Sequence, residues 1–232
     1  MMNGKRVEFT SRLTRGQAVA ALVYLPVHVL LLPLLATALL LWGKLDEAQA
    51  NLLCYAVGTA YMLIFLWRFL RRDFDALCDR PWACILEVCI SYGVMWCCNV
   101  LVNGVMLALG LGDNPNNEAV FGMAGIEFGQ IAAMTVFMAP IVEECIFRAG
   151  LFGVIRRRNR TLAYLVSIAM FSLYHVWSYA FLDVRNLVYL LQYIPISYLL
   201  CRCYERTNTI WSCIFLHMLV NGLSMAAVYA LM

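Results

Sequence analysis

Three groups of polar residues lie inside long apolar stretches of this chain. The first holds Glu143, Glu144 and Arg148, the second is Phe171-Ser-Leu-Tyr-His175, and the third is His217-Met-Leu-Val-Asn221. A charged side chain near the centre of a bilayer costs about 2.5–3.5 kcal/mol on insertion scales, so it needs a compensating interaction or a function. Carboxylates and imidazoles commonly transfer protons in catalysis. Because two of the chain's three histidines lie in these groups, we interpret them as an active site assembled within a membrane.

The spacing inside each group predicts which side chains share a helix face. Glu144 and Arg148 are four positions apart, as are His217 and Asn221, and residues at this separation are neighbours on a helix surface. Glu143 is rotated by about 100° from Glu144, so the two carboxylates need not have the same role.

The groups are also predicted to lie at similar depths. At ~1.5 Å per residue from the basic ends of their stretches, Glu143 lies about 18 Å, His175 about 21 Å, His217 about 14 Å and Asn221 about 20 Å along the helix. Three separate helices therefore carry polar groups to one level. Pro140, just before the carboxylates, lacks an N–H group and predicts a kink there.

Composition places the chain in a membrane. Of 232 residues, 63% are hydrophobic and 13% are charged, whereas soluble globular chains are about 45–50% apolar and about 25% charged. The ten cysteines include no C-x-x-C pair and no zinc-finger spacing, so we interpret them as packing residues and expect no disulfides. The net charge of +3 is small, and we expect no nucleic-acid partner.

Seven apolar stretches predict seven membrane-spanning helices. Their approximate ranges are 18–42, 50–67, 82–109, 127–152, 161–181, 186–201 and 208–231. Most approach the ~20 residues that cross ~30 Å of hydrocarbon, although the sixth is short and contains Pro195. A polar loop over 110–125 separates the first three from the last four. We therefore expect an all-α, polytopic transmembrane bundle, with residues 1–125 lacking the polar groups and residues 126–232 carrying them.

Basic residues predict the orientation of the bundle. Fourteen lie before the first stretch or after the second, fourth and sixth: Lys5, Arg6, Arg12, Arg15, Arg68, Arg71, Arg72, Arg80, Arg156, Arg157, Arg158, Arg160, Arg202 and Arg206. The opposite loops hold only Lys44 and Arg185. The positive-inside rule then predicts a multi-pass protein of the plasma membrane with a cytoplasmic N-terminus. The arginine run at 156–160 is interpreted as part of this signal, a site for anionic lipid being the alternative.

The three groups, taken in order, resemble the CPBP family. The pattern is Glu143-Glu-x-x-x-Arg148, then Phe171-x-x-x-His175, then His217-x-x-x-Asn221, on successive apolar segments. The family includes type II CAAX prenyl endopeptidases, bacteriocin-processing or self-immunity proteins, and Abi proteins. The resemblance covers roughly residues 130–225, and no motif position departs from it. It implies that residues 126–232 are a catalytic core that hydrolyses a peptide bond within the membrane.

The resemblance implies roles that spacing alone does not assign. Glu143 would be the base that activates water, since a carboxylate in apolar surroundings holds a proton tightly enough to work near neutral pH. His175 would hold or polarise that water. His217 and Asn221 would donate hydrogen bonds to the oxyanion. For all four residues, structural hydrogen bonding between helices is the alternative.

Two supporting contacts are expected around these residues. Glu144 and Arg148 would form an ion pair that orients the helix and limits the net buried charge. Phe171, one turn before His175, would pack its ring edge beside the site.

Metal dependence is left open by the sequence. Glu143, His175 and His217 could form a three-ligand set with a fourth position for water, as in catalytic zinc sites. However, the sequence contains no His-Glu-x-x-His motif and no evident carboxylate that would orient a histidine ligand. We therefore expect glutamate chemistry without a cofactor, with zinc as the alternative.

Three further polar residues lie in or beside the apolar stretches. His28, between Pro26 and Pro33, is expected to be structural. Glu87 is expected to bond a neighbour near the cytoplasmic interface, with a place on a substrate path as the alternative. Glu127 is expected to be solvated at the outer edge of the fourth stretch.

The leading interpretation is an endopeptidase whose partners are membrane lipids and a hydrophobic substrate, either a peptide with or without a lipid group or a membrane protein. A transporter or proton relay is one alternative, because buried ionisable residues also mark ion paths. Many transporters have duplicated halves, and this sequence shows no duplication. A non-catalytic immunity or scaffold protein that kept the site is the other alternative.

Overall fold

The computed structural model describes residues 9–232; Lys5 and Arg6, which entered the predicted orientation, lie outside this range. The described residues form helices and connecting turns without a β-strand. Within them, seven helices are long and apolar enough to cross a membrane: Arg15–Leu41, Glu47–Cys78, Pro81–Ala108, Pro115–Arg156, Arg160–Leu182, Val184–Thr207 and Ile210–Ala230. The prediction of an all-α bundle with seven membrane-spanning helices is confirmed.

Several spans are built from more than one helical segment. The first is α1 (Arg15–Pro26), η1 (Val27–Leu31) and α2 (Leu32–Leu41), followed by α3 (Glu47–Cys78) and α4 (Pro81–Ala108). The fourth is α5 (Pro115–Ala133), η2 (Met134–Met138), α6 (Ala139–Glu144), η3 (Cys145–Phe152) and α7 (Gly153–Arg156). Then come α8 (Arg160–Leu182), the 3₁₀ turn η4 (Val184–Tyr189), α9 (Leu190–Thr207) and α10 (Ile210–Ala230). The segments η1, η2 and η3 are π-helical.

The predicted ends of two elements are wrong. α3 continues to Cys78, so Arg68, Arg71 and Arg72 lie on its last turns rather than in a loop, because Phe69 and Leu70 are buried there and no helix breaker precedes Pro81. The predicted loop over 110–125 is helical from Pro115, where the Asn114 side chain caps the backbone N–H of Asn116 and the proline occupies the first turn.

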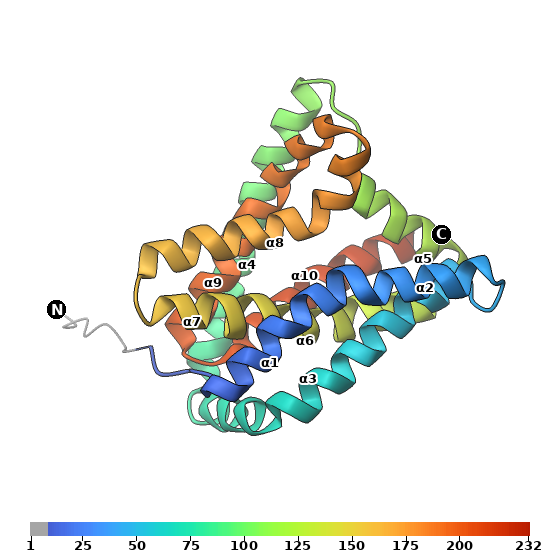
Figure 1. The fold of residues 1–232 in the computed structure, drawn as a ribbon. Coiled ribbons are helices and arrows are strands. Elements are labelled where there is room, and N and C mark those ends of the chain that lie inside the picture. The colour runs from blue at the N-terminus through green and yellow to red at the C-terminus, as the bar shows by residue number, and fades with distance from the viewer. Residues whose placement is uncertain (1–8) are drawn as a thin grey trace.

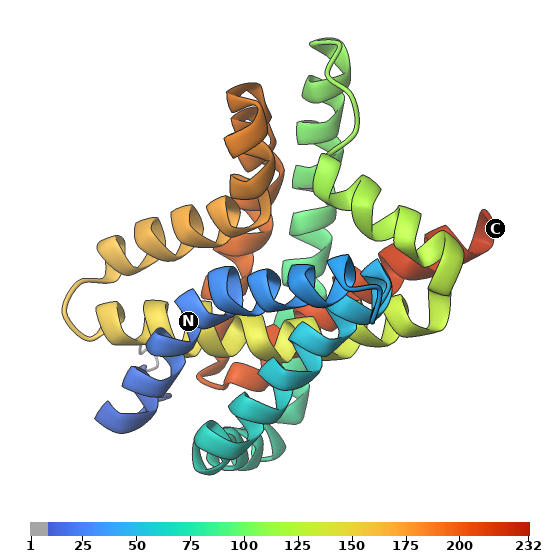
Figure 2. The ribbon, with the colours of Figure 1, turned by 45° about the vertical axis from the view of Figure 1, so that its right-hand side comes forward.

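The fourth span runs across the middle of the molecule (Figures 1 and 2). Its segment η3 packs against α1, α8, α9 and α10. From Ala139 to Phe152, every residue except Ile141 and Leu151 is buried. The span bends at Glu127, whose φ of −128° and ψ of 59° are not helical and whose side chain is exposed. The carboxylates at 143 and 144 are therefore held in the most enclosed part of the bundle.

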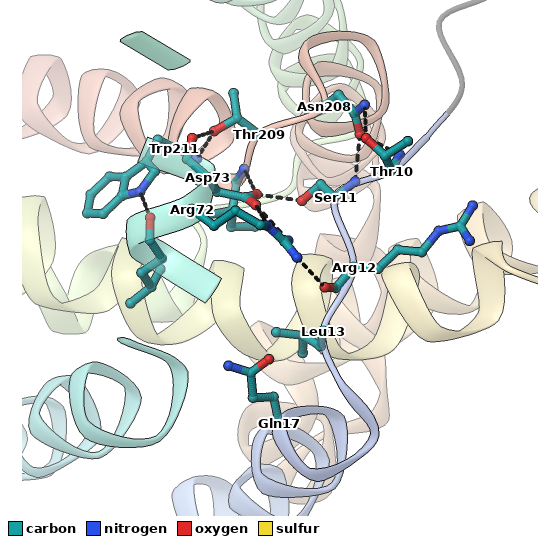
Figure 3. A network of polar contacts seen from close by, with 12 residues as sticks. Thr10, Ser11, Arg12, Leu13, Gln17, Arg72, Asp73, Asn208, Thr209 and Trp211 are labelled. Atoms are coloured by element: carbon teal, nitrogen blue, oxygen red, sulfur yellow. Dashed lines mark hydrogen bonds and ion pairs between the residues drawn. The ribbon is translucent and has the colours of Figure 1, made fainter. Parts of the chain in front are cut away.

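The segment before α1 is hydrogen-bonded to the ends of other spans (Figure 3). The buried carboxylate of Asp73 accepts hydrogen bonds from Ser11 Oγ at 2.5 Å and from the backbone N–H of Ile210 at 2.9 Å. The side chain of Asn208 accepts two more, from the backbone of Ser11 and of the residue before it, each at 2.8 Å. The start of α1, the end of α3 and the turn between α9 and α10 therefore lie at one end of the bundle.

Arginines at this end pair with two acidic side chains. Glu205 pairs with Arg156 at 2.5 Å and Arg160 at 2.8 Å, and Glu87 pairs with Arg202 and with Arg206, the latter at 3.1 Å. Four of the arginines predicted to be cytoplasmic, from the segments after the fourth and sixth stretches, thus share one end of the bundle. Which side of the membrane that end faces stays a prediction.

Candidate active site

A cavity of about 1150 Å³ lies within the bundle. Residues of η1, α2, α3, α4, α5, η2, α6, α8, α9 and α10 line it, and Glu143, His175, His217 and Asn221 are among them. Figure 2 shows α4 (green) and α9 (orange) extending toward the top of the view, away from the central span. The four residues predicted to carry the chemistry therefore line a single cavity inside the membrane-spanning part.

Three of those residues converge on one carboxylate oxygen. Glu143, which is 3% exposed, accepts a hydrogen bond at Oε1 from the hydroxyl of Tyr55 at 3.0 Å. Its other oxygen, Oε2, has no hydrogen-bond partner among the described residues. Oε2 lies 3.8 Å from Nε2 of His175 and 3.9 Å from Nε2 of His217. Side chains from α6, α8 and α10 thus meet at a buried acceptor that is left unbonded.

The hydrogen bond on the far side of His175 fixes its tautomer. Nδ1 lies 2.9 Å from the backbone carbonyl of Phe171, and a carbonyl oxygen only accepts, so Nδ1 carries the proton. In the neutral ring, Nε2 is then an acceptor that faces Glu143 Oε2, also an acceptor. A molecule that donates two hydrogen bonds, such as water, can bridge two acceptors at this separation.

Aromatic contacts hold the His175 ring in place. The ring of Tyr193 stacks on it at a centroid distance of 4.4 Å, and the ring of Phe171 lies 4.5 Å away. Phe171 also takes the Arg148 guanidinium over its face at 4.0 Å and lies 6.0 Å from the His217 ring. The Phe171 ring therefore packs against both histidines and the Arg148 guanidinium. The sequence predicted only that its edge packs beside the site.

The expected pair of Glu144 and Arg148 is present, and both side chains are fully buried. The Glu144 oxygen that lies 3.2 Å from Arg148 also lies 2.8 Å from Nδ1 of His217. Arg148 additionally donates to Ser197 Oγ at 3.1 Å. Glu144 thus orients a motif histidine as well as its own helix, a contact between residues 73 positions apart that spacing within one helix could not indicate.

Asn221 has a backbone partner that follows from the π-helical segment before Pro140. In η2 the N–H of Ala139 bonds to the carbonyl of Met134, one residue further back than in an α-helix. The next carbonyl, that of Thr135, would bond to residue 140, but proline has no N–H. Asn221 Nδ2 donates to this carbonyl at 2.8 Å. One amide hydrogen of Asn221 is therefore used in the bond to the central helix, and the second can be donated to another acceptor.

The candidate zinc ligands lie slightly farther apart than the ligands of a bound zinc ion, and metal dependence stays a prediction. Two ligands in tetrahedral zinc, each ~2.0–2.1 Å from the metal, are about 3.4 Å apart. The distances from Glu143 Oε2 to the two imidazole nitrogens are 3.8 and 3.9 Å. No group of three or more His, Cys, Asp or Glu side chains arranged to hold a metal occurs in residues 9–232.

Sequence reasoning missed two tyrosines and gave His28 only a structural role. The Tyr174 hydroxyl lies 2.9 Å from the hydroxyl of Tyr55 and 3.0 Å from Nε2 of His28. An ionisable residue inside a membrane span is a functional candidate by default, and that rule would have marked His28. The contacts also show that a span within residues 1–125, which carry no motif, reaches Glu143 directly through Tyr55. The division at residue 125 stays a prediction.

Comparisons with known proteins concern the segment that holds this site. Residues 126–223 match the family model described as type II CAAX prenyl endopeptidase Rce1-like. A protein of Bacillus subtilis (strain 168) named "Putative membrane peptidase YdiL" is 33% identical over 85 residues. That alignment covers 36% of this chain and 31% of the relative, so it spans less than a third of the relative's length. No solved structure matches the chain.

Proposed function

We propose that this membrane chain, whose residues 126–223 belong to the CAAX-type (CPBP) protease family, is an intramembrane endopeptidase in which Glu143 activates the attacking water. One observation carries the proposal: the unbonded Oε2 of a buried glutamate faces two imidazole nitrogens at 3.8 and 3.9 Å in a cavity. Each of the three side chains comes from a different helix, so their meeting is a property of the fold.

The first step is attack by water on the scissile carbonyl. A water molecule that donates one hydrogen to Glu143 Oε2 and the other to His175 Nε2 is held with its lone pairs free for the carbon. As its oxygen bonds to the carbon, Glu143 takes one proton and the carbonyl oxygen becomes an oxyanion. Glu143 then gives that proton to the leaving nitrogen as the C–N bond breaks. Glutamate ends ionised, and the products are a carboxylic acid and an amine.

The oxyanion is stabilised from α10. The Glu144 carboxylate holds Nδ1 of His217 at 2.8 Å, so Nε2 is the ring atom that faces the cavity and donates to the oxyanion when the ring carries both protons. The second amide hydrogen of Asn221 is the other donor, and the bond to the Thr135 carbonyl fixes its side chain. Removing one oxyanion donor typically lowers kcat by about 10²–10³-fold.

The cavity suits a polypeptide substrate that reaches the site from the membrane. Exposed apolar side chains such as Phe121 and Ile126 on α5 and Trp177 on α8 line it together with the polar site residues. Such a mixed lining fits a hydrophobic peptide, with or without a lipid group, or a membrane protein. The class of substrate that the protein cleaves is part of this proposal.

The test compares cleavage by three forms of the protein in lipid vesicles. Wild type, Glu143→Gln and Glu127→Gln are incubated with a library of hydrophobic peptides, and products are identified by mass spectrometry. Glu127 is the matched control because it lies on the same span, lines the same cavity and is exposed. We expect cleavage by wild type and Glu127→Gln, and a loss of about 10²–10⁴-fold in Glu143→Gln. Ion flux that depends on Glu143, with no cleavage by wild type, would instead indicate a transporter.

A further inference from the structure

A chain of four polar side chains runs from span one to the back of Glu143. His28 Nε2 lies 3.0 Å from the Tyr174 hydroxyl, Tyr174 lies 2.9 Å from the Tyr55 hydroxyl, and Tyr55 lies 3.0 Å from Glu143 Oε1. The four residues come from η1, α8, α3 and α6. The catalytic steps described above use only Glu143 from this set, so the other three groups require their own explanation.

The number of hydrogens that these four side chains can donate fixes the direction of each hydrogen bond between them. An ionised carboxylate only accepts, so Tyr55 gives its single hydroxyl hydrogen to Glu143. Tyr55 therefore accepts from Tyr174, whose only hydrogen is then used. Tyr174 in turn accepts from His28, which must carry its proton on Nε2. In the neutral ring, Nδ1 of His28 is then the bare nitrogen, and it is buried without a hydrogen-bond partner among the described residues.

We propose that Tyr55 is a positioning residue that decides which oxygen of Glu143 carries the catalytic proton, and that Tyr174 and His28 hold Tyr55 in that role. With Oε1 occupied by the Tyr55 hydrogen, the proton taken from water can reside only on Oε2, the oxygen that faces His175, His217 and the cavity. The proton is thus kept on the side from which it is returned to the leaving amine. This inference rests on the proposed function of Glu143.

The direction of the hydrogen bonds remains the same whether Glu143 is ionised or protonated at Oε2. In both states Oε1 is an acceptor, so Tyr55, Tyr174 and His28 do not rearrange during turnover. The other charged and titratable groups around Glu143 are His175 on α8, His217 on α10, and Glu144 and Arg148 on its own span. Removing one hydroxyl can change the pH dependence of the reaction. A matched control is therefore needed to assign such a change to the hydrogen-bonded chain from His28 to Glu143.

Tyr55→Phe removes the hydroxyl and keeps the ring. The control is Tyr61→Phe on the same helix, because the Tyr61 hydroxyl donates to the backbone carbonyl of Ala20 at 3.1 Å and does not touch the site. For Tyr55→Phe we expect kcat to fall roughly 10- to 100-fold, the range for a lost hydrogen bond to a charged group. KM should stay within about 3-fold, because ground-state binding does not use Oε1.

The pH profile is the measurement that a purely structural role would not change. A carboxylate that loses a hydrogen-bond donor holds its proton more tightly, so the acid limb of the kcat profile should move to higher pH in Tyr55→Phe. Tyr174→Phe should move it less in the same direction, since Tyr55 still donates to Glu143. Tyr55→Phe and Tyr61→Phe with the same kcat and the same acid limb would overturn the inference.

A second measurement does not depend on cleavage. Nitrogen-15 NMR of histidine-labelled wild-type protein should show His28 as a neutral ring protonated at Nε2, and Tyr174→Phe should remove that preference. A His28 ring protonated at Nδ1 alone in wild type would overturn the inference even if Glu143→Gln is inactive. If Glu143→Gln cleaves at the wild-type rate, the proposed function fails instead, and the NMR result still reports on the chain.

Discussion

Arg148 is one of the largest fully buried side chains among residues 9–232, and replacing it should be strongly destabilising. We predict that Arg148→Met lowers the free energy of unfolding by about 3–5 kcal/mol, because the buried Glu144 carboxylate loses its guanidinium partner and keeps only the His217 ring. Methionine has a similar volume and can fill the same space, so the loss reports on the charge rather than on a cavity.

The magnitude follows from the contacts of Arg148. At the 3.2 Å separation of the pair, two unit charges attract by about 5 kcal/mol at an effective dielectric constant of ~20. The hydrogen bond to Ser197 at 3.1 Å and the guanidinium over Phe171 at 4.0 Å add about 1 and about 2 kcal/mol. The cost of burying the cation offsets a large part of these gains, which leaves the 3–5 kcal/mol range measured when one partner of a buried pair is removed.

The assay is reversible unfolding in mixed detergent micelles, followed by tryptophan fluorescence. Arg160→Met is the control, because its partner Glu205 lies 2.8 Å away but the Arg160 side chain is 59% exposed. Solvent screens such a pair, so the control should lose no more than about 1 kcal/mol. The double variant Glu144→Gln with Arg148→Met should recover part of the loss, since no unpaired charge remains. Equal losses for Arg148→Met and Arg160→Met would refute the reasoning.

Two other predictions concern the site. Asn221→Leu should lower both activity and the free energy of unfolding, the latter by about 1–3 kcal/mol, because the Thr135 carbonyl loses its partner; unchanged stability in thermal unfolding would show that this bond does not support the fold. Protein stripped of metal by a chelator should cleave peptide at the untreated rate when assayed in metal-free buffer. Full loss of cleavage that zinc alone restores would contradict glutamate chemistry without a cofactor.

The spans could be predicted because lipid imposes a length on apolar helices, and the seven stretches were long enough to be counted. The ends of spans could not be read in the same way. α3 keeps helical geometry past the apolar stretch because Phe69 and Leu70 pack into the core, and packing is not visible in hydropathy. The polar run after Asn114 looked like a loop although Asn-Pro is also a helix start.

The convergence of Glu143, His175 and His217 was predictable from their distances to the basic ends of their helices. The contacts that orient them were not. Asn221 bonds to Thr135 only because a π-helical turn and Pro140 together free that carbonyl. Tyr55 lies 88 positions from Glu143, and a single tyrosine in an apolar stretch carries no motif. The roles of the motif residues stay predictions until they are measured.

Hydrolysis in water enriched in oxygen-18 examines the role of Glu143 in one turnover. An identified peptide substrate is mixed with excess protein in vesicles, and the new carboxyl terminus is weighed by mass spectrometry. Wild type and Glu127→Gln should each place one heavy oxygen in the new terminus, and Glu143→Gln should yield no product in the same time. Product from Glu143→Gln at the wild-type rate, with the same label, would contradict a glutamate-activated water.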